Sequence, residues 1–172
     1  MPTAAMAIRE LPLLMTPTTP PAGLAALYER HYEAVFRAAL RVTGNPADAE
    51  DVLQTVFLRV LARGDGGDVE MPAAYFRRAA VNAAVDVLRR REMHAESAYE
   101  DREHVVQPHL LLKERLRRAI AALDGEDASL FLLRYVEGLT NEELAVMFQL
   151  EKNNVAVKLH RIRHRLQAEM QR

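Results

Sequence analysis

The chain has 172 residues, enough for one ordinary domain or for two small ones. Apolar residues make up 49% of the sequence, so it can bury hydrophobic cores, and its formal net charge of −1 argues neither for nor against a nucleic-acid partner. The absence of cysteine excludes disulfides, cysteine-ligated zinc and a cysteine nucleophile.

Membrane insertion is not expected, because no apolar run approaches the roughly 20 residues that a membrane-spanning helix needs. Near the N-terminus, four prolines interrupt any signal-peptide core: Pro12, Pro17, Pro20 and Pro21. We therefore expect a soluble, cytoplasmic protein.

The first predicted elements are an extension and a helix. Residues 1–22 are rich in Pro, Thr and Met and have no hydrophobic period, which predicts a mobile N-terminal extension. A helix is predicted from Gly23 to Val42, followed by Gly44. Asn45 then caps a second helix that opens with Pro46. The residues of the first helix expected to face inward are Leu24, Leu27, Tyr28, Tyr32, Val35, Phe36 and Ala39.

The remaining elements are also helical. The second helix ends at the glycines of positions 64–67, and Pro72 opens a third helix that is predicted to reach Met93. Residues 94–108 lose the periodicity and gather acids, which predicts a flexible linker. Helices at 109–123 and 126–137 and a helix-turn-helix follow, and no strand-like alternation occurs. The predicted fold class is all-α, with two small helical domains at residues 23–93 and 109–172.

The helix-turn-helix has a basic second helix. Thr140 and Glu143 form a capping box at the start of its first helix. The second helix has an apolar stripe, with cations between its members; the stripe is Val155, Leu159, Ile162 and Leu166, and the cations are Lys158, Arg161, Arg163 and Arg165. A helix buried along one stripe and cationic elsewhere suits a DNA major groove. The alternative is an ordinary solvated face, because cations also stabilise the C-terminal turns of helices.

Three stretches resemble the conserved regions of the extracytoplasmic-function group of bacterial sigma factors, the two-domain specificity subunits of RNA polymerase. Residues 27–60 contain Asp51-Val52-Leu53-Gln54-Thr55-Val56-Phe57, similar to the family's clamp-binding helix. Residues 75–91 contain Ala80-Val81-Asn82 and Asp86-Val87-Leu88-Arg89-Arg90, similar to the helix that melts and reads the minus-ten element. Residues 132–166 resemble the region that reads the minus-thirty-five element.

The resemblance implies three sets of binding residues. Core polymerase would be bound by Glu50, Asp51, Gln54 and Phe57. Minus-ten reading and melting would use Tyr75, Phe76, Arg77, Arg78, Asn82, Asp86, Arg89 and Arg90. Minus-thirty-five DNA would be contacted by Asn153, Asn154, Lys158, Arg161 and Arg165. The implied partners are the clamp and flap of core RNA polymerase, promoter DNA and an anti-sigma factor.

The residue chemistry is consistent with these roles, but alternatives remain open. Aromatic rings beside arginines can stack on single-stranded bases and contact phosphates. Tyr75 and Phe76 could instead be core residues, and Asp86 could simply pair with Arg90 one turn away. In the free protein we expect the two domains to pack together, with the acidic linker beside residues 77–91 masking the DNA surface.

Three residues depart from the family pattern. Thr55 stands where a Glu is usual, Gln149 where the turn commonly has Gly, and Glu151 where a Ser or Thr usually caps the recognition helix, so that Asn153 is expected to cap one turn later. These departures keep two alternatives in view: a free-standing helix-turn-helix regulator, or a degenerate sigma-like adaptor that binds protein. No catalytic constellation or third metal ligand beside His160 and His164 is present, so we expect no cofactor and no enzymatic activity.

Overall fold

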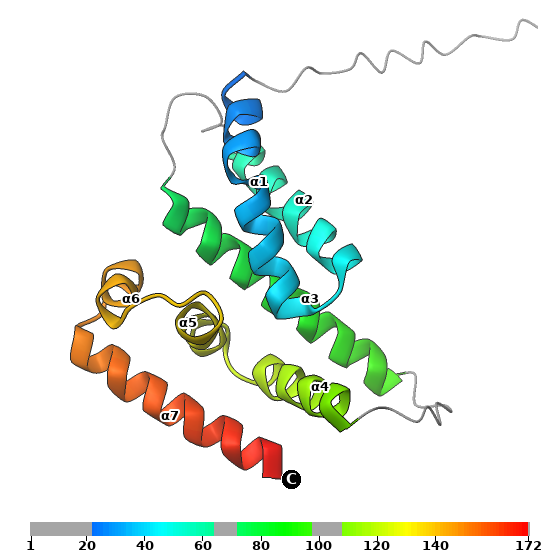
Figure 1. Ribbon diagram of the computed structural model, residues 1–172, viewed down its shortest axis with the longest axis vertical. Helices are drawn as coiled ribbons and strands as arrows, with labels where there is room; N and C mark the ends of the chain where they lie inside the picture. The colour runs from blue at the N-terminus through cyan, green and yellow to red at the C-terminus, as the bar shows by residue number, and fades with distance from the viewer. Residues whose placement is uncertain (1–21, 64–71, 98–107, 172) are drawn as a thin grey trace, which may run out of the picture.

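A computed structural model describes residues 22–63, 72–97 and 108–171, and within these ranges all regular structure is α-helical (Figure 1). The helices are α1 (Ala22–Thr43), α2 (Pro46–Ala62), α3 (Ala73–Ser97), α4 (Pro108–Ala121), α5 (Gly125–Tyr135), α6 (Asn141–Phe148) and α7 (Lys152–Gln171). The predicted all-α class is confirmed. The extension, the glycine-rich segment and most of the predicted linker lie outside the described residues.

The predicted turn between α1 and α2 is present. Gly44 has a φ of +68°, a conformation that glycine adopts without steric cost. The Asn45 side chain accepts hydrogen bonds from the backbone N–H groups of Ala47, at 2.8 Å, and Asp48, at 3.4 Å, while Pro46 occupies the first turn. The cap fixes the residue at which α2 begins, so the start of this helix follows from its local sequence.

Helices α1, α2 and α3 pack against one another as one unit. Their core is apolar and includes Val35, Val52, Val56 and Phe76, none of them more than 1% exposed. One part of the prediction is wrong: Tyr28 and Tyr32 are 42% and 45% exposed and stack on each other with ring centroids 5.5 Å apart. They lie at the edge of the apolar face of α1 rather than inside it.

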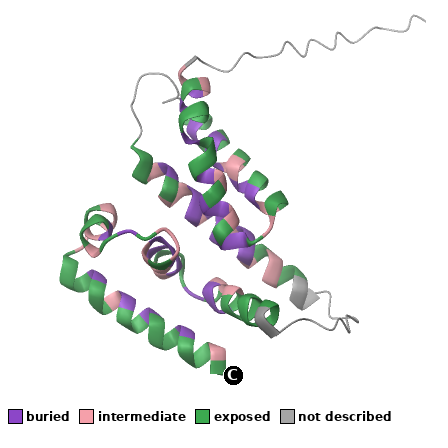
Figure 2. Cartoon of the chain, in the orientation of Figure 1, coloured by how far each residue is buried: buried purple, intermediate pink, exposed green. Residues whose placement is uncertain are grey.

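Helices α4 to α7 form the second unit, in which α7 packs against α4, α5 and α6 (Figure 1). The capping box is confirmed, with the Glu143 carboxylate 2.7 Å from the Thr140 N–H and the Thr140 hydroxyl 3.2 Å from the Glu143 N–H. The apolar stripe of α7 is at most 4% exposed, as predicted (Figure 2). This buried stripe fixes which residues of α7 face solvent.

Three predicted helix ends change by two residues or more. Helix α3 continues to Ser97, so residues 94–97 add about one turn to the helix and are not part of the linker. Helix α4 ends at Ala121, and helix α5 ends at Tyr135 with Val136 as its C-cap, each two residues before the predicted end. The two shorter differences fall within the fraying that is usual at helix ends.

The two units pack on opposite sides of α3, which lies between α1 and α2 on one side and α4 and α5 on the other (Figure 1). In its middle α3 is buried around most of its circumference, at Ala80, Val81, Ala83, Ala84, Val85, Val87 and Leu88. Burial on so many sides is expected of a helix covered from two directions. The same apolar cluster continues through both units.

His31 is a buried polar residue within the first unit. It is 7% exposed, its ring stacks on Phe76 at 4.2 Å, and its Nε2 has no hydrogen-bond partner within the described ranges. Burial, helped by the nearby positive charge of Arg30, lowers the pKa of His31 below its ordinary value of 6.5. The folded protein therefore holds His31 neutral at a pH where the unfolded chain binds a proton.

This pKa difference gives a testable pH dependence of stability. The free energy of unfolding should fall as the pH drops through the ordinary histidine range, because protons then favour the unfolded chain. His31→Leu should flatten this dependence between about pH 7 and pH 5, as measured by urea unfolding; His160→Gln, at an exposed histidine of α7, is the control for losing a histidine. An unchanged slope in His31→Leu would contradict the argument.

Candidate nucleic-acid interface

One stripe of α3 faces the C-terminal unit. Arg78, Asn82, Val85 and Arg89 recur at spacings of four, three and four, so they share one side of the helix. We call these four residues the seam stripe. Three of them are predicted minus-ten residues, and Val85 is only 1% exposed because the C-terminal unit covers it.

The two arginines of the seam stripe bind the C-terminal ends of helices. Arg89 donates to the carbonyl oxygens of Ala121, at 3.2 Å, and Leu123, at 2.5 Å, at the end of α4. Arg78 donates to the Met147 carbonyl at 2.6 Å, near the end of α6, and its guanidinium lies 4.4 Å from the centre of the Phe148 ring. Each cation meets carbonyls that lack helical partners and carry the negative end of the helix dipole.

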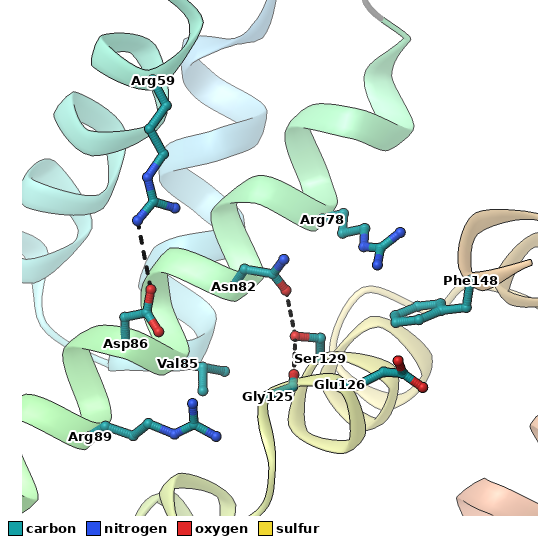
Figure 3. A pocket seen from close by; sticks show the side chains of 10 residues that line it. All are labelled: Arg59, Arg78, Asn82, Val85, Asp86, Arg89, Gly125, Glu126, Ser129 and Phe148. Carbon is teal, nitrogen blue, oxygen red and sulfur yellow. Dashed lines mark hydrogen bonds and ion pairs between the residues drawn. The ribbon is translucent and has the colours of Figure 1, made fainter. Parts of the chain in front are cut away.

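Asn82 completes the stripe through Ser129 of α5, which is 3% exposed. The Ser129 Oγ lies within hydrogen-bond distance of both Asn82 and the Gly125 carbonyl (Figure 3). A hydroxyl has one proton, and a carbonyl can only accept. The single proton of Ser129 therefore serves one of two acceptors at a time, the Asn82 Oδ1 or the Gly125 carbonyl. The polar head of Asn82 is thus used within the protein.

A cavity of about 370 Å³ remains between the units, beside these contacts (Figure 3). Arg59, Asp86 and the seam stripe line it on the N-terminal side, and Gly125, Glu126, Ser129 and Phe148 on the other. Asp86 pairs with Arg59 at 3.7 Å, an interaction between α2 and α3 rather than the alternative pair with Arg90. At this cavity the C-terminal unit does not cover α3 completely.

The other predicted minus-ten residues divide into buried and exposed ones. Phe76 is completely buried against His31 and Phe57, so the prediction that it stacks on bases is wrong and its alternative, a core role, is correct. Tyr75 is half-buried, and its hydroxyl accepts a hydrogen bond from Arg63 at 2.9 Å. Arg77 and Arg90 are exposed. Only part of the predicted set is therefore accessible as the molecule stands.

Further polar contacts join the two units away from the seam stripe. Arg41 and Glu137 form an ion pair of 2.7 Å, and Glu137 has only 7% of its side chain exposed. Arg117 donates to the Val42 carbonyl at 3.2 Å, and Arg118 pairs with Glu92 at 3.0 Å. These contacts involve no predicted DNA-binding residue, so they can be altered independently of DNA binding.

Helix α7 presents only some of its predicted DNA residues. Lys158 forms an ion pair with Glu126, and Arg165 lies 3.3 Å from Asp127, both acids belonging to α5. The hydrogen bond to Glu126 raises the pKa of Lys158, and burial raises the pKa of Asp127. Asn153, Asn154 and Arg161 are exposed. Asn153 lies inside the first turn of α7, so the expectation that it caps the helix is wrong.

Helix α2 presents an outward stripe opposite its buried side. Glu50, Asp51 and Gln54 are exposed, as their predicted binding role requires. Phe57 is only 7% exposed and packs against Phe76, so it is not available as a contact residue. Sequence reasoning missed Leu58, which is 61% exposed and one turn beyond Gln54. The signal in the sequence was a leucine at a position that the amphipathic pattern of α2 places toward solvent.

Comparisons with known proteins follow the same division. The model of sigma-70 region 2 matches residues 27–93, and the model of sigma-70 region 4 matches residues 113–166. The RNA polymerase sigma-E factor of Streptomyces avermitilis is 29% identical over 147 residues, covering 81% of this chain and 80% of that protein. The extracytoplasmic-function sigma factor SigL of Mycobacterium tuberculosis strain H37Rv is 27% identical over 150 residues, covering 80% and 82%.

The chain is a sigma factor of the extracytoplasmic-function group. It belongs to the sigma-70 family and carries regions 2 and 4, so the predicted resemblance is confirmed. The sigma factor RpoE of Bartonella quintana, solved in complex with the anti-sigma factor NepR, aligns at 15% identity with a TM-score of 0.49, covering 86% of this chain and 96% of that one.

In this sigma factor, region 2 corresponds to α1 to α3 and region 4 to α4 to α7. The seam stripe is therefore a part of region 2 that is covered by region 4. Among the described residues, no helix has the length and apolar character to cross a membrane.

The turn of this sigma factor's helix-turn-helix is strained at Gln149, which has a φ of +55°. Its N–H still reaches the Ala145 and Val146 carbonyls, so the turn forms despite the side chain. Left-handed backbone costs a residue with a Cβ about 1 kcal/mol. The family's glycine would relieve this cost.

Gln149→Gly should therefore raise the free energy of unfolding by up to about 1 kcal/mol, the strain at this position less the entropy that glycine adds to the unfolded chain. Urea unfolding followed by circular dichroism measures it. Gln167→Gly, at an exposed position inside α7, should lower the same quantity by about 1 kcal/mol. A loss of stability in both variants would show that Gln149 makes a contact worth more than the strain.

Proposed function

We propose that this sigma factor recruits core RNA polymerase to promoters from a closed form, in which region 4 covers the minus-ten helix of region 2. The observation that carries the proposal is the seam stripe. Arg78, Asn82 and Arg89 each use a hydrogen-bonding group on region 4. A side chain that donates to a protein carbonyl cannot give the same N–H to a phosphate or a base edge.

Binding to promoter DNA then requires the two regions to separate. The minus-ten and minus-thirty-five elements lie about 25 base pairs apart at about 3.4 Å each, a distance far greater than the width of a small domain. Regions 2 and 4 have to be held apart to reach both. Polymerase supplies this separation by binding each region at its own surface, the clamp to region 2 and the flap to region 4.

The polymerase clamp would bind the outward stripe of α2. Acids and an amide beside an exposed leucine suit a basic surface that also buries an apolar side chain, because charge gives orientation and apolar area gives affinity. Thr55 removes one charge from the pattern usual in the family. Leu58 adds apolar area on the same face. We propose that this exchange preserves clamp affinity.

In α7, we propose that Asn153, Asn154 and Arg161 contact the upstream promoter element, while Lys158 and Arg165 support the fold. The support is their surroundings: Lys158 and Arg165 form ion pairs with acids of α5, although Arg165 is also exposed, whereas the other three are exposed and form no ion pair with α5 within the described ranges. The protein would act in the cytoplasm, where polymerase and promoters are. An anti-sigma partner follows from family membership and would stabilise the form in which these surfaces are covered.

Run-off transcription tests the proposed function as a whole. Purified core polymerase would be supplied with a pool of the host's genomic promoters, with and without this protein. New transcripts that share an upstream motif are the expected result. Core binding without any new transcript would contradict promoter recognition and favour the alternative of a sigma-like adaptor.

The role of α2 leads to one prediction. Leu58→Asp should weaken the affinity for core polymerase by at least about tenfold, because burying a leucine is worth about 1.5–3 kcal/mol and a buried aspartate adds a desolvation cost. Fluorescence anisotropy of the labelled chain titrated with core polymerase measures it. Met93→Asp, at a position 62% exposed on α3, is the matched control. Equal affinities of the two variants would show that Leu58 does not lie in the interface with core polymerase.

The closed form leads to another prediction. Glu137→Arg places like charges beside Arg41 and should favour the open form. Binding of a single-stranded minus-ten oligonucleotide by the free chain should tighten about fivefold, the factor that corresponds to about 1 kcal/mol. Fluorescence anisotropy of the labelled oligonucleotide measures this affinity.

The double variant Arg41→Glu with Glu137→Arg restores an ion pair and should restore the affinity of the original protein. Circular dichroism checks that each variant is folded. If Glu137→Arg binds the oligonucleotide no better than the original protein while remaining folded, region 4 does not mask region 2.

A further inference from the structure

The orientation of α7 shows which of its residues face away from the protein. The buried stripe of Val155, Leu159, Ile162 and Leu166 is held against the rest of region 4. With 3.6 residues per turn, the side opposite this stripe carries Asn153, Val157, His160, Arg161 and His164. These five residues are all exposed. They form the face of α7 that a major groove would meet, which we call the outward face.

The cations on the flank of α7 do not contribute to this face. Lys158 and Arg165 are turned toward α5, where Glu126 and Asp127 neutralise them. The sequence pattern places them among the DNA contacts, but the fold uses them to hold α5 against α7. Sequence discrimination by this helix therefore has to come from the outward face.

Val157 is the unusual member of the outward face. It is 49% exposed, although its neighbours there are polar or charged. It lies in the second turn of α7, which begins at Lys152. The N-terminal turns are the part of a recognition helix that reaches base edges. The branched methyl groups of Val157 cannot hydrogen-bond, so an apolar group is the partner that suits them.

We propose that Val157 reads a thymine of the upstream promoter element by packing against its 5-methyl group. In the major groove the thymine methyl is the apolar feature of a base pair, and small apolar side chains are the groups that recognise it. This inference rests on the proposed function, because it assigns a base to one position of the same recognition helix.

The neighbours of Val157 on the outward face are placed to contact bases on either side of it. Asn153 and Arg161 lie one turn before and one turn after it, about 6 Å away along the helix axis. An amide pairs with adenine and a guanidinium with guanine or phosphate. Val157 then lies between two polar readers, where the amino group or carbonyl oxygen of a wrong base would find no partner and a methyl group would be buried.

The test compares thymine with uracil, which pairs identically and lacks only the methyl group. Holoenzyme made from the full chain and core polymerase first selects its preferred promoters from a library randomised over the upstream element. Each thymine of the selected motif is then replaced by deoxyuridine, one at a time. Equilibrium binding of each duplex is measured with the original protein, with Val157→Ala and with Val146→Ala as the matched control, since Val146 is 82% exposed on α6.

At one thymine, uracil should weaken binding by the original protein about fourfold, the factor that burial of one methyl group gives. The same replacement should cost clearly less for Val157→Ala, which lacks the γ-methyl groups that reach the thymine, and should still cost about fourfold for Val146→Ala. Equal responses of the original protein and Val157→Ala at every thymine would overturn the inference, as would a motif in which no thymine is sensitive. If no motif and no promoter-dependent transcript appear, the proposed function itself fails, before Val157 is tested.

Discussion

The burial of α3 on two opposite sides is the constraint on which the arrangement of this sigma factor depends. Within region 2, α1 and α2 pack against one side of α3 and form an apolar core with it. Region 4 packs against the other side through the seam stripe. The second side carries Arg78, Asn82 and Arg89, which we propose read the minus-ten element. Under this proposal, packing of the two regions and recognition of DNA compete for the same arginines and the same asparagine, so the protein cannot satisfy both at once.

The chemistry of the two sides explains why one can open while the other stays closed. The core of region 2 is apolar, and exposing it would cost the hydrophobic free energy that holds the domain together. The seam shares the apolar cluster that continues through both units, but it also depends on polar contacts: guanidinium groups on helix-end carbonyls, the Asn82 oxygen on a serine, and ion pairs that each have one exposed arginine. Each such contact is worth about 1 kcal/mol net, because water replaces it when the seam opens. A surface of this kind separates when polymerase offers better partners.

Local signals were readable from the sequence and tertiary ones were not. Asn45, the capping box at Thr140 and the stripe of α7 were predicted correctly, because each is decided by residues within one or two turns. The burial of Phe76 and Phe57, the exposure of Tyr28 and the neutralisation of Lys158 depend on what lies across from them in the fold. The masking of α3 was expected from the acidic linker, but the structure shows region 4 in contact with α3, and the described residues of the predicted linker belong to α3 and α4. The sequence alone does not distinguish an arginine that contacts DNA from one that binds the end of a helix.

The most direct test of the closed form is the distance between the two regions, measured by energy transfer between two dyes. Because the chain has no cysteine, one dye can be attached at Ala34→Cys on α1 and the other at Ala168→Cys on α7, both exposed positions. A closed form gives efficient transfer in the free protein and a large loss of transfer when core polymerase is added. Low transfer in the free protein, or the same transfer with and without polymerase, would contradict it.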